Sequence, residues 1–420
     1  MKPRQYPAGI ALAINVVVMS LPQAQAQTLE ERVERLEREN REQAAALQRQ
    51  QETIAEQKQA LEGAPGRVKA LGEAMEQERI AGTDWLENIE LAVLIEVEAS
   101  YVEPFDAPAE SDIVLANFEL GITAEVSDWV EIGASLLYEQ DETPLEVDLA
   151  YATIRNEEVT PVFLTAGQIY VPFGAYETNL VSDPLTLEIG ETRETALQLG
   201  FVYRGFSGSV YGFSGDNKVN GENRIGSWGA NLAYSREHED LIWAVGAGYI
   251  NDLGDSDTLW DAVVENRNAR LEELLEGEDP AAGSFSTDST ERTPGWTANL
   301  GVSLGGIDFI AEYLSAVTDF DPDSLSYKGR GAKPSAWNIE LGYSFPVFGK
   351  DSTVAAACQG SDESVSLGLP TERWLVGWSI DIFEHTALSF EYSYDTDYSV
   401  ANGGTGNNAN AFVAQLAVEF

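Results

Sequence analysis

The chain has 420 residues, of which 70 are Asp or Glu and 25 are Lys or Arg, giving a formal net charge of -45. A charge of this sign excludes nucleic acid as a partner, because phosphate backbones are themselves strongly negative. The single cysteine, Cys358, has no second cysteine with which to form an internal disulfide.

Residues 1–26 are predicted to be a secretory signal peptide. Lys2 and Arg4 precede an apolar stretch over 10–21, and Ala24 and Ala26 supply the small residues of a cleavage site. The stretch is too short to cross a bilayer as a helix. We therefore expect an exported protein, which can enter a membrane only as a closed barrel because lipid cannot satisfy open sheet edges.

Residues 27–83 are predicted to form a periplasmic α-helical coiled coil. Apolar side chains recur seven residues apart from Val33 to Met75, and a companion column runs from Leu36 to Leu71. Polar residues interrupt both columns, and Pro65 should kink or break the helix. A coiled coil requires partner helices, and a homotrimer is preferred because porin barrels are often trimeric. The alternative is a solvated acidic linker.

Residues 84–420 alternate apolar and polar side chains in roughly sixteen segments of about ten residues, the length that crosses a bilayer as a tilted strand. In the first segment Leu91, Val93 and Ile95 share one face, whereas Glu96 and Glu98 share the other. The pattern predicts an all-β, 16-stranded antiparallel transmembrane β-barrel. Two packed soluble sheets are the alternative, since their strands also have an inner and an outer face.

The apolar faces of two further segments are assigned from the same alternation. Val114 and Ala116 fall on the apolar face of the second segment, and Leu149, Tyr151 and Thr153 on that of the fourth. The polar faces supply the predicted lining of the lumen, because carboxylates there require water. The predicted lining residues are Glu96, Glu98, Glu119, Glu125, Glu131, Glu139, Glu146, Asp148, Gln168, Glu312, Glu340 and Glu391.

The connections between the segments are alternately short and long. The short ones include 204–205 and 305–306, and the long ones include 172–194 and 250–295. Short periplasmic turns and long outer loops are typical of bacterial outer-membrane barrels. We therefore expect a protein embedded in the outer-membrane lipid of a Gram-negative bacterium.

The third long connection, 172–194, is the candidate constriction loop. In a 16-stranded barrel this loop commonly folds into the lumen, where acidic side chains would favour cations over anions. An ordinary solvated outer loop is an equally good interpretation. The candidate constriction residues are Glu177, Asp183, Glu188, Glu191, Arg193 and Glu194.

The longest connection, 250–295, contains a predicted helix over 259–276. Leu271, Leu274 and Leu275 lie at helical spacing on it. The helix is either a lid over the barrel mouth or a surface helix, and the sequence does not choose between them.

Catalytic chemistry is not indicated. His238 and His385 fall in predicted turns, and neither has a Ser, Cys or carboxylate at the spacing of a nucleophile and its base. No glycine-rich phosphate loop and no Cys/His metal cluster is present in the sequence. We therefore expect no enzyme, no cofactor and no metal site.

The order of signal peptide, coiled coil, barrel and terminal Phe420 resembles that of the LbtU-type siderophore porins. The segment Gly-Gln-Ile-Tyr-Val-Pro-Phe-Gly at 167–174, together with Asp183-Pro-Leu-Thr and Glu191, carries the resemblance. It implies uptake of a small polar solute such as a ferric siderophore, without the plug of energy-coupled receptors. It assigns no residue to the siderophore. Phe420 resembles the terminal residue that the barrel-assembly machinery recognises.

Two functional hypotheses follow. The first is a water-filled outer-membrane channel, either for a ferric siderophore or as a general cation-preferring porin. The second is a structural protein whose coiled coil tethers the envelope while the barrel only anchors it. Eight strands leave an interior filled by side chains, whereas sixteen leave an aqueous lumen, so the channel is favoured. The transported substrate is not determined by the sequence.

Overall fold

The computed structural model describes residues 88–221, 224–277, 289 and 291–420, which belong to the unit Asp84–Phe420 of the chain. The predicted signal peptide and coiled coil lie outside the described residues.

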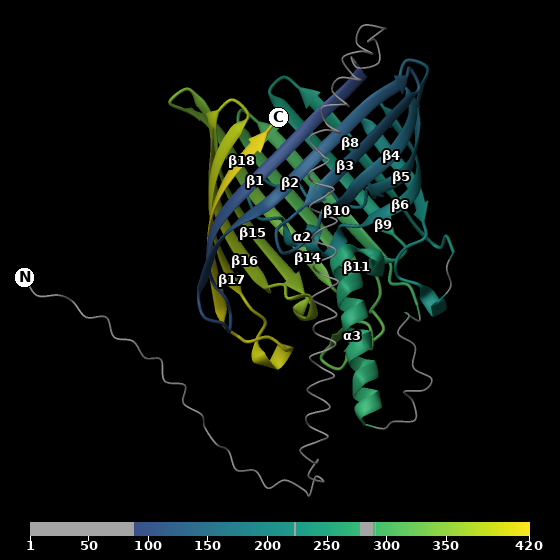
Figure 1. The fold of residues 1–420 in the computed structure, drawn as a ribbon, viewed down its shortest axis with the longest axis vertical. Helices are drawn as coiled ribbons and strands as arrows, with labels where there is room; N and C mark the ends of the chain where they lie inside the picture. The colour runs from purple at the N-terminus through teal and green to yellow at the C-terminus, as the bar shows by residue number, and fades with distance from the viewer. Residues whose placement is uncertain (1–87, 222–223, 278–288, 290) are drawn as a thin grey trace, which may run out of the picture. The chain divides into compact units, whose positions relative to one another are not determined.

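Sixteen of the described strands close into one antiparallel barrel, which confirms the predicted architecture (Figure 1). Each strand pairs with its neighbours along the chain, and β1 pairs with β18 to close the cylinder. The barrel strands are β1 (Ile89–Glu103), β2 (Glu110–Ser127), β3 (Val130–Tyr138), β4 (Glu146–Asn156), β5 (Thr160–Tyr170), β6 (Arg193–Tyr203), β7 (Phe206–Phe213), β8 (Ser227–His238), β9 (Leu241–Ile250), β10 (Gly295–Leu304), β11 (Ile307–Ala316), β14 (Ser335–Val347), β15 (Lys350–Asp362), β16 (Glu372–Phe383), β17 (Thr386–Thr396) and β18 (Asn408–Glu419).

The connections alternate in length, as the sequence predicted. At one end the strands are joined by tight turns such as 204–205 and 305–306. The backbone φ angles are 53° and 85° at Arg204 and Gly205, and 58° and 83° at Gly305 and Gly306. Two successive positive φ angles are characteristic of type I′ turns, whose twist matches that of the flanking strands.

The long connections gather at the opposite end, which is the lower end of the barrel in Figure 1. They carry short elements of their own. These are α2 (Leu185–Gly190), η2 (Val219–Gly221), η3 (Leu253–Asp255), α3 (Asp257–Glu276), the hairpin of β12 (Ser326–Tyr327) and β13 (Arg330–Gly331), η5 (Val365–Leu367) and η6 (Val400–Asn402).

The outward faces of the strands are apolar and end in aromatic residues. On neighbouring strands, Trp228 lies against Tyr249 with ring centroids 5.4 Å apart, and Tyr234 lies against Trp243 at 5.3 Å. Trp228 and Tyr234 lie on the same face of β8, six residues and therefore about 20 Å apart along the strand. Between them the outward side chain of Leu232 is 55% exposed.

Two β-bulges change the faces predicted for the second and fourth segments. The β1–β2 register shifts between Glu96 and Val97, so Leu115 rather than Val114 shares the outward face with Val97. The β3–β4 register shifts between Ala134 and Leu136. The predicted outward placement of Val114, and of Leu149, Tyr151 and Thr153, is therefore wrong. Ala116 is the unpaired extra residue of β2. An extra residue in one strand reverses the alternation on one side of it.

The buried apolar residues form a cluster between the barrel wall and the long loops. Its fully buried members include Leu185 and Ile189 of α2, Leu253 of η3 and Leu259 of α3. Helix α3 packs against α2 and η5, with Leu259, Val263 and Leu274 buried, whereas Leu275 is 60% exposed. Among the described helices, none combines the length and the hydrophobicity needed to cross a membrane.

Candidate functional site

The connection between β5 and β6, residues 171–192, runs across the inside of the barrel. Its first part accepts a hydrogen bond at the carbonyl oxygen of Phe173 from the Thr297 hydroxyl on β10, at 2.6 Å. Further along, the Leu185 amide donates to Oε1 of Gln359 on β15, at 3.2 Å. In the closed ring of sixteen strands β10 is five strands from β5 and β15 is eight. The contact with β15 therefore lies across the lumen from the point where the connection begins.

Carboxylates of the wall bind the backbone of this loop. Glu312 on β11 accepts hydrogen bonds from the amides of Ala175 and Tyr176, at 2.8 and 3.0 Å, and from the Thr186 hydroxyl at 3.0 Å. Backbone amides within a loop have no ladder partner, and a buried donor without an acceptor is costly. A carboxylate satisfies several of them at once and is itself stabilised by the bonds.

The same arrangement recurs on two further strands. Glu340 on β14 accepts from the Thr178 hydroxyl at 2.7 Å and from the backbone and side-chain amides of Asn179 at 2.7 and 2.8 Å. Glu391 on β17 accepts from the Val181 amide at 2.7 Å, and from both the amide and the hydroxyl of Ser182. We call Glu312, Glu340 and Glu391 the anchoring carboxylates.

The anchoring carboxylates were predicted to line the aqueous lumen, and the structure corrects this. Glu312, Glu340 and Glu391 are 5%, 1% and 2% exposed, because the loop covers them. Their charge is directed into hydrogen bonds with the loop rather than toward water. The sequence shows these residues on the inner face but not that a distant segment lies on top of them.

The loop is also packed against itself. Tyr176 has a positive φ of 55°, which is uncommon for a residue with a side chain. Its side chain covers Gly174 and Gly190, where an added Cβ would lie 2.3 Å from a ring carbon and 2.1 Å from the hydroxyl oxygen of Tyr176, respectively. These glycines therefore allow the two ends of the loop to meet around one aromatic ring.

Asp183 and Glu188 remain on the open side of the loop. Asp183 is exposed and Glu188 is half-buried. Partial desolvation inside the barrel, followed by the nearby carboxylates of Glu139, Glu391 and Glu98, raises the pKa of Asp183. Desolvation and Asp183 likewise raise the pKa of Glu188, which Arg373 partly offsets. Both carboxyl groups therefore lie near other carboxylates, and Glu188 also lies near one arginine.

Glu191, at the end of α2, lies at the junction with α3. Desolvation, and then the carboxylates of Asp257 and Asp183, raise the pKa of Glu191 to about 7. Desolvation also raises the pKa of Asp257, the first residue of α3, to about 6. The Asp257 amide donates to the Glu191 carbonyl oxygen at 3.0 Å, and this backbone hydrogen bond holds the two residues next to each other.

Glu177, the remaining acidic residue of the loop, is exposed and lines a cavity of about 370 Å³ with Asp308.

Arg193 and Glu194 were assigned to the loop, but they are the first residues of β6. Arg193 pairs with wall carboxylates on β4, with Nη1 2.6 Å from Glu146 and 3.0 Å from Asp148. Tyr170 also donates to Asp148, at 2.8 Å. The arginine therefore neutralises the wall rather than the constriction loop.

Gln168 was predicted to line the lumen, and its position corrects this. It alternates along β5 with Thr165 and Ile169, which point inward, so it lies on the opposite face. Its side-chain amide donates to the carbonyl oxygens of Val147 and Asp148, at 2.9 and 2.7 Å. The Gln168 side chain thus supplies hydrogen-bond donors to backbone carbonyl oxygens at the β4 bulge.

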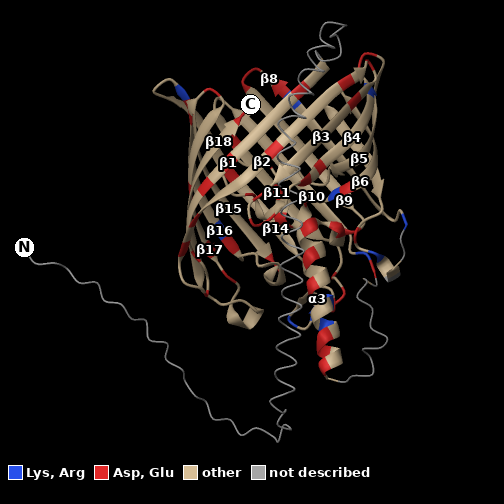
Figure 2. Cartoon of the chain, in the orientation of Figure 1, with Lys and Arg blue, Asp and Glu red and all other residues tan. Residues whose placement is uncertain are grey.

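The wall that faces the open side of the loop is formed by β1 to β3. By strand register, the acidic residues of this wall share one face, and they retain partial exposure. Acidic residues outnumber basic ones across the barrel and along α3 (Figure 2). The predicted lining residues that lie on this wall are Glu96, Glu98, Glu119, Glu125, Glu131 and, just beyond β3, Glu139.

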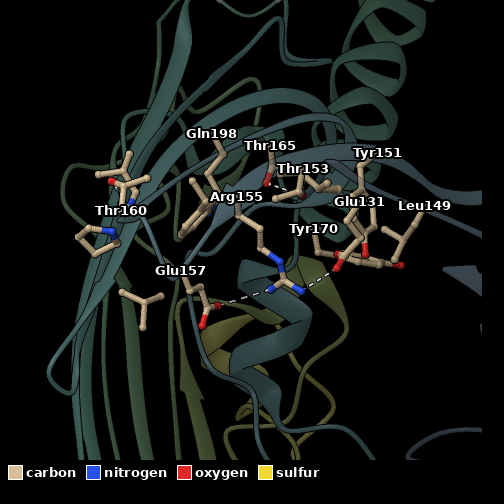
Figure 3. Close-up of a pocket in the computed structure, with 15 residues that line it drawn as sticks. Glu131, Leu149, Tyr151, Thr153, Arg155, Glu157, Thr160, Thr165, Tyr170 and Gln198 are labelled. Atoms are coloured by element: carbon tan, nitrogen blue, oxygen red, sulfur yellow. Dashed lines mark hydrogen bonds and ion pairs between the residues drawn. The ribbon is translucent and has the colours of Figure 1, made fainter. Parts of the chain in front are cut away.

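A groove on the inner wall over β4 and β5 was missed at the sequence level. It has a volume of about 410 Å³, and Tyr151, Phe163 and the Thr153–Thr165 pair line it beside Arg155 (Figure 3). The Tyr151 ring lies over Gly133, and the Phe163 ring lies over Gly200. The alternation in the sequence places Tyr151 and Thr153 on the outward face, and the β4 bulge turns both side chains inward. Glycines opposite inward aromatic residues are the sequence feature that could have indicated them.

The last residue is part of the barrel closure. The Phe420 amide donates to the Val93 carbonyl oxygen at 2.9 Å, and the Val93 amide donates to the Phe420 carbonyl oxygen at 2.8 Å.

Within the described part of the chain, no group of three or more His, Cys, Asp or Glu side chains is placed to hold a metal ion.

Comparison with known sequences gives relatives without an assigned activity in their names. A UPF0422 protein of Legionella pneumophila strain Lens is 28% identical over 365 residues, covering 79% of this chain and 66% of the relative. A UPF0422 protein of Coxiella burnetii is 26% identical over 324 residues, covering 75% and 65%. The chain thus spans slightly less than two thirds of the length of these relatives. No family model matches it.

Comparison with solved structures gives OprB, a porin and an outer-membrane channel. OprB of Pseudomonas putida aligns with a TM-score of 0.55 and 9% identity, over 80% of this chain and 94% of that one. An anion-selective porin from Comamonas acidovorans aligns with 0.52 and 11%, over 79% and 99%. The outer-membrane channel DcaP of Acinetobacter baumannii aligns with 0.51 and 12%, over 79% and 97%. The described barrel therefore has the porin fold.

Proposed function

We propose that the protein is an outer-membrane channel through which small polar solutes diffuse, with a constriction that prefers cations. The observation that carries the proposal is the loop 171–192, whose backbone is bound by the anchoring carboxylates on the far wall. A loop held across a lumen narrows it without closing the barrel. A barrel that serves only as an anchor has no need of such a loop.

The outer surface supports a position in lipid. Its apolar face ends in aromatic pairs at both ends of β8 and its neighbours, about 20 Å apart. Outer-membrane barrels carry an apolar band about 25 Å tall between two aromatic girdles. The tight turns then face the periplasm, and the long loops face the outside of a Gram-negative cell.

The cation preference rests on the carboxylates that the loop leaves uncovered. Asp183 and Glu188 face a wall that carries Glu98 and Glu139. A carboxylate about 5 Å from a passing ion in water changes the ion's free energy by ~0.8 kcal/mol, or about fourfold in local concentration. Several carboxylates at one constriction therefore attract cations and repel anions.

Planar bilayers with a KCl gradient test this proposal. The purified protein should show ohmic conductance with a reversal potential that indicates cation preference. Asp183→Asn together with Glu188→Gln should lower the cation-to-anion permeability ratio several-fold. Glu384→Gln, a matched change at an exposed turn residue, should leave the ratio unchanged. A wild-type preference for anions, or a double variant with the original ratio, would contradict the proposed constriction.

A ferric siderophore is the narrower form of this proposal. It rests on the resemblance over 167–174 and 183–186 to the siderophore porins; these residues enter and form the loop that crosses the lumen. Growth on ferric chelates as the sole iron source, with and without the gene, tests it. Equal growth would leave the general channel as the function.

Assembly is proposed on the same basis. The protein would form a homotrimer through both the barrel and the coiled coil predicted over 27–83. The barrel-assembly machinery would recognise Phe420, the residue that follows β18. The coiled coil would lie in the periplasm, where it could also tether the envelope. Cross-linking of the full chain in cells, compared with a chain lacking 27–83, measures the contribution of this segment to the oligomer.

A further inference from the structure

The groove over β4 and β5 combines chemical groups that the proposed diffusion channel does not require. Its apolar sides are the rings of Tyr151 and Phe163, and its floor is the Thr153–Thr165 pair, whose hydroxyls are 2.8 Å apart. Each hydroxyl therefore already has a hydrogen-bond partner in the other. At about 410 Å³, the groove lies in the size range of small-molecule sites.

Arg155 closes one end of the groove. Its Nη2 atom donates to Oε2 of Glu131 at 2.6 Å, while Nη1 is 4.0 Å from the highly exposed carboxylate of Glu157. The Arg155 side chain is 49% exposed. Figure 3 shows the guanidinium between Glu157 and Glu131. Among the described residues, Glu131 is the acceptor of its hydrogen bond, so further N–H groups can bind a ligand. Arginine binds a carboxylate through two such groups at once.

Negative charge lies directly beside this arginine. Glu131 on β3 is paired in register with Glu125 on β2, and two like charges opposite each other in a sheet repel. Arg155 bonds to Glu131, and its hydrogen bonds do not extend to Glu125. Both glutamates line a polar cavity of about 330 Å³, and Arg155 and Glu131 line this cavity as well as the groove. An ammonium group placed between Glu125 and Glu131 would relieve the repulsion.

We infer that this groove binds a zwitterionic solute with an apolar side chain, such as an apolar α-amino acid or a short peptide. The solute carboxylate binds the guanidinium of Arg155, and its ammonium group lies between Glu125 and Glu131. The apolar side chain lies on the rings of Tyr151 and Phe163. This inference rests on the proposed channel and assigns it a class of preferred solute.

Other solute classes satisfy only part of the site. A simple cation uses the glutamates but places no group on the aromatic rings or on the further N–H groups of Arg155. An aromatic acid uses the arginine and the rings but meets Glu131 and Glu125 without an ammonium group. The zwitterion alone places a group of suitable chemistry at each of the three parts.

Calorimetric titration of the full chain in lipid nanodiscs with L-phenylalanine tests the inference. We expect saturable binding, with phenethylamine, 3-phenylpropionate and glycine each binding about tenfold more weakly, a difference of ~1.4 kcal/mol. Each of these probes lacks one of the three matching groups. No saturable binding of L-phenylalanine, or equal binding of phenethylamine, would overturn the inference.

Variants locate the binding. Arg155→Gln and Phe163→Leu should each weaken L-phenylalanine binding at least about fivefold. Arg236→Gln, which changes an exposed arginine of β8, should leave the affinity unchanged. Unaltered affinity in both groove variants would overturn the assignment. If a variant does not fold, as judged by heat-dependent mobility in gels, the probe series on the unaltered protein still decides.

Conductance recorded on the same preparation separates this inference from the proposed function. A chain that conducts ions but does not bind L-phenylalanine retains the channel and loses the site. A chain that binds L-phenylalanine but does not conduct retains the site and loses the channel.

Discussion

At the scale of single residues, the carboxylates of this barrel have two distinct roles. Glu340 is 1% exposed and binds the loop, whereas Asp183 is exposed on the open side of that loop. The difference follows from what each carboxylate faces. Backbone amides without ladder partners stabilise the first, and water and neighbouring carboxylates surround the second.

The raised pKa of Glu191, about 7, predicts a pH-dependent channel. Because this value lies above the ordinary 4.5, Glu191 gains its charge only as the pH rises through 7, and cation preference should increase between pH 6 and 8. The effect of Glu191 on the free energy of unfolding has the opposite direction. A raised pKa stabilises the folded state below pH 4.5, and this contribution is lost as the pH rises from 4.5 toward 7. Reversal potentials measured across this range check the prediction.

Glu191→Gln provides the control for this pH dependence. The variant should lose most of the change between pH 6 and 8 and retain the part centred near pH 6, because Asp257 has a pKa of about 6. An unchanged pH profile in the variant would assign the effect to other groups.

At the scale of elements, the barrel and the loop 171–192 depend on each other. The inner face of β14 has no partner for Glu340 except the loop segment above it, within the described residues. The loop in turn has few bonds of its own and uses wall acceptors for its amides. Strands that close a barrel thus also determine the path of a segment far away in the sequence.

Glu340→Gln should weaken this attachment. A hydrogen bond to a charged group contributes about 1.5–3 kcal/mol, so we expect lower stability and faster cleavage of the loop by a broad-specificity protease. Glu177→Gln makes the same chemical change at an exposed residue of the same loop and should have no effect. Equal cleavage rates in the two variants would show that the carboxylate does not hold the loop.

At the scale of the whole molecule, the outward and inward faces are expected to lie in different solvents. Leu232→Arg, at the middle of the outward face of β8, should cost about 2–4 kcal/mol in lipid. Ala233→Arg, on the next residue and the opposite face, should cost much less because it would reach water. Urea unfolding of the barrel in liposomes measures both. Similar losses in the two variants would contradict the assignment of the faces.

Much of the barrel could be predicted from the sequence, because strand alternation and turn residues are local properties. The sixteen strands, their closure into a barrel and the inner faces of Glu96 and Glu131 follow from them. The bulges could not be predicted, since an extra residue leaves the composition of a segment unchanged while it reverses the faces of Tyr151 and Thr153.

The sequence by itself determined the closed barrel of antiparallel strands, because each strand carries the alternation of apolar and polar side chains along its own length. Only the tertiary structure decided which acidic residues meet water. That outcome depends on contacts between positions more than a hundred residues apart, such as Glu312 with Ala175 and Glu391 with Val181. No local pattern encodes such a pairing, because it exists only after the barrel has closed around the loop.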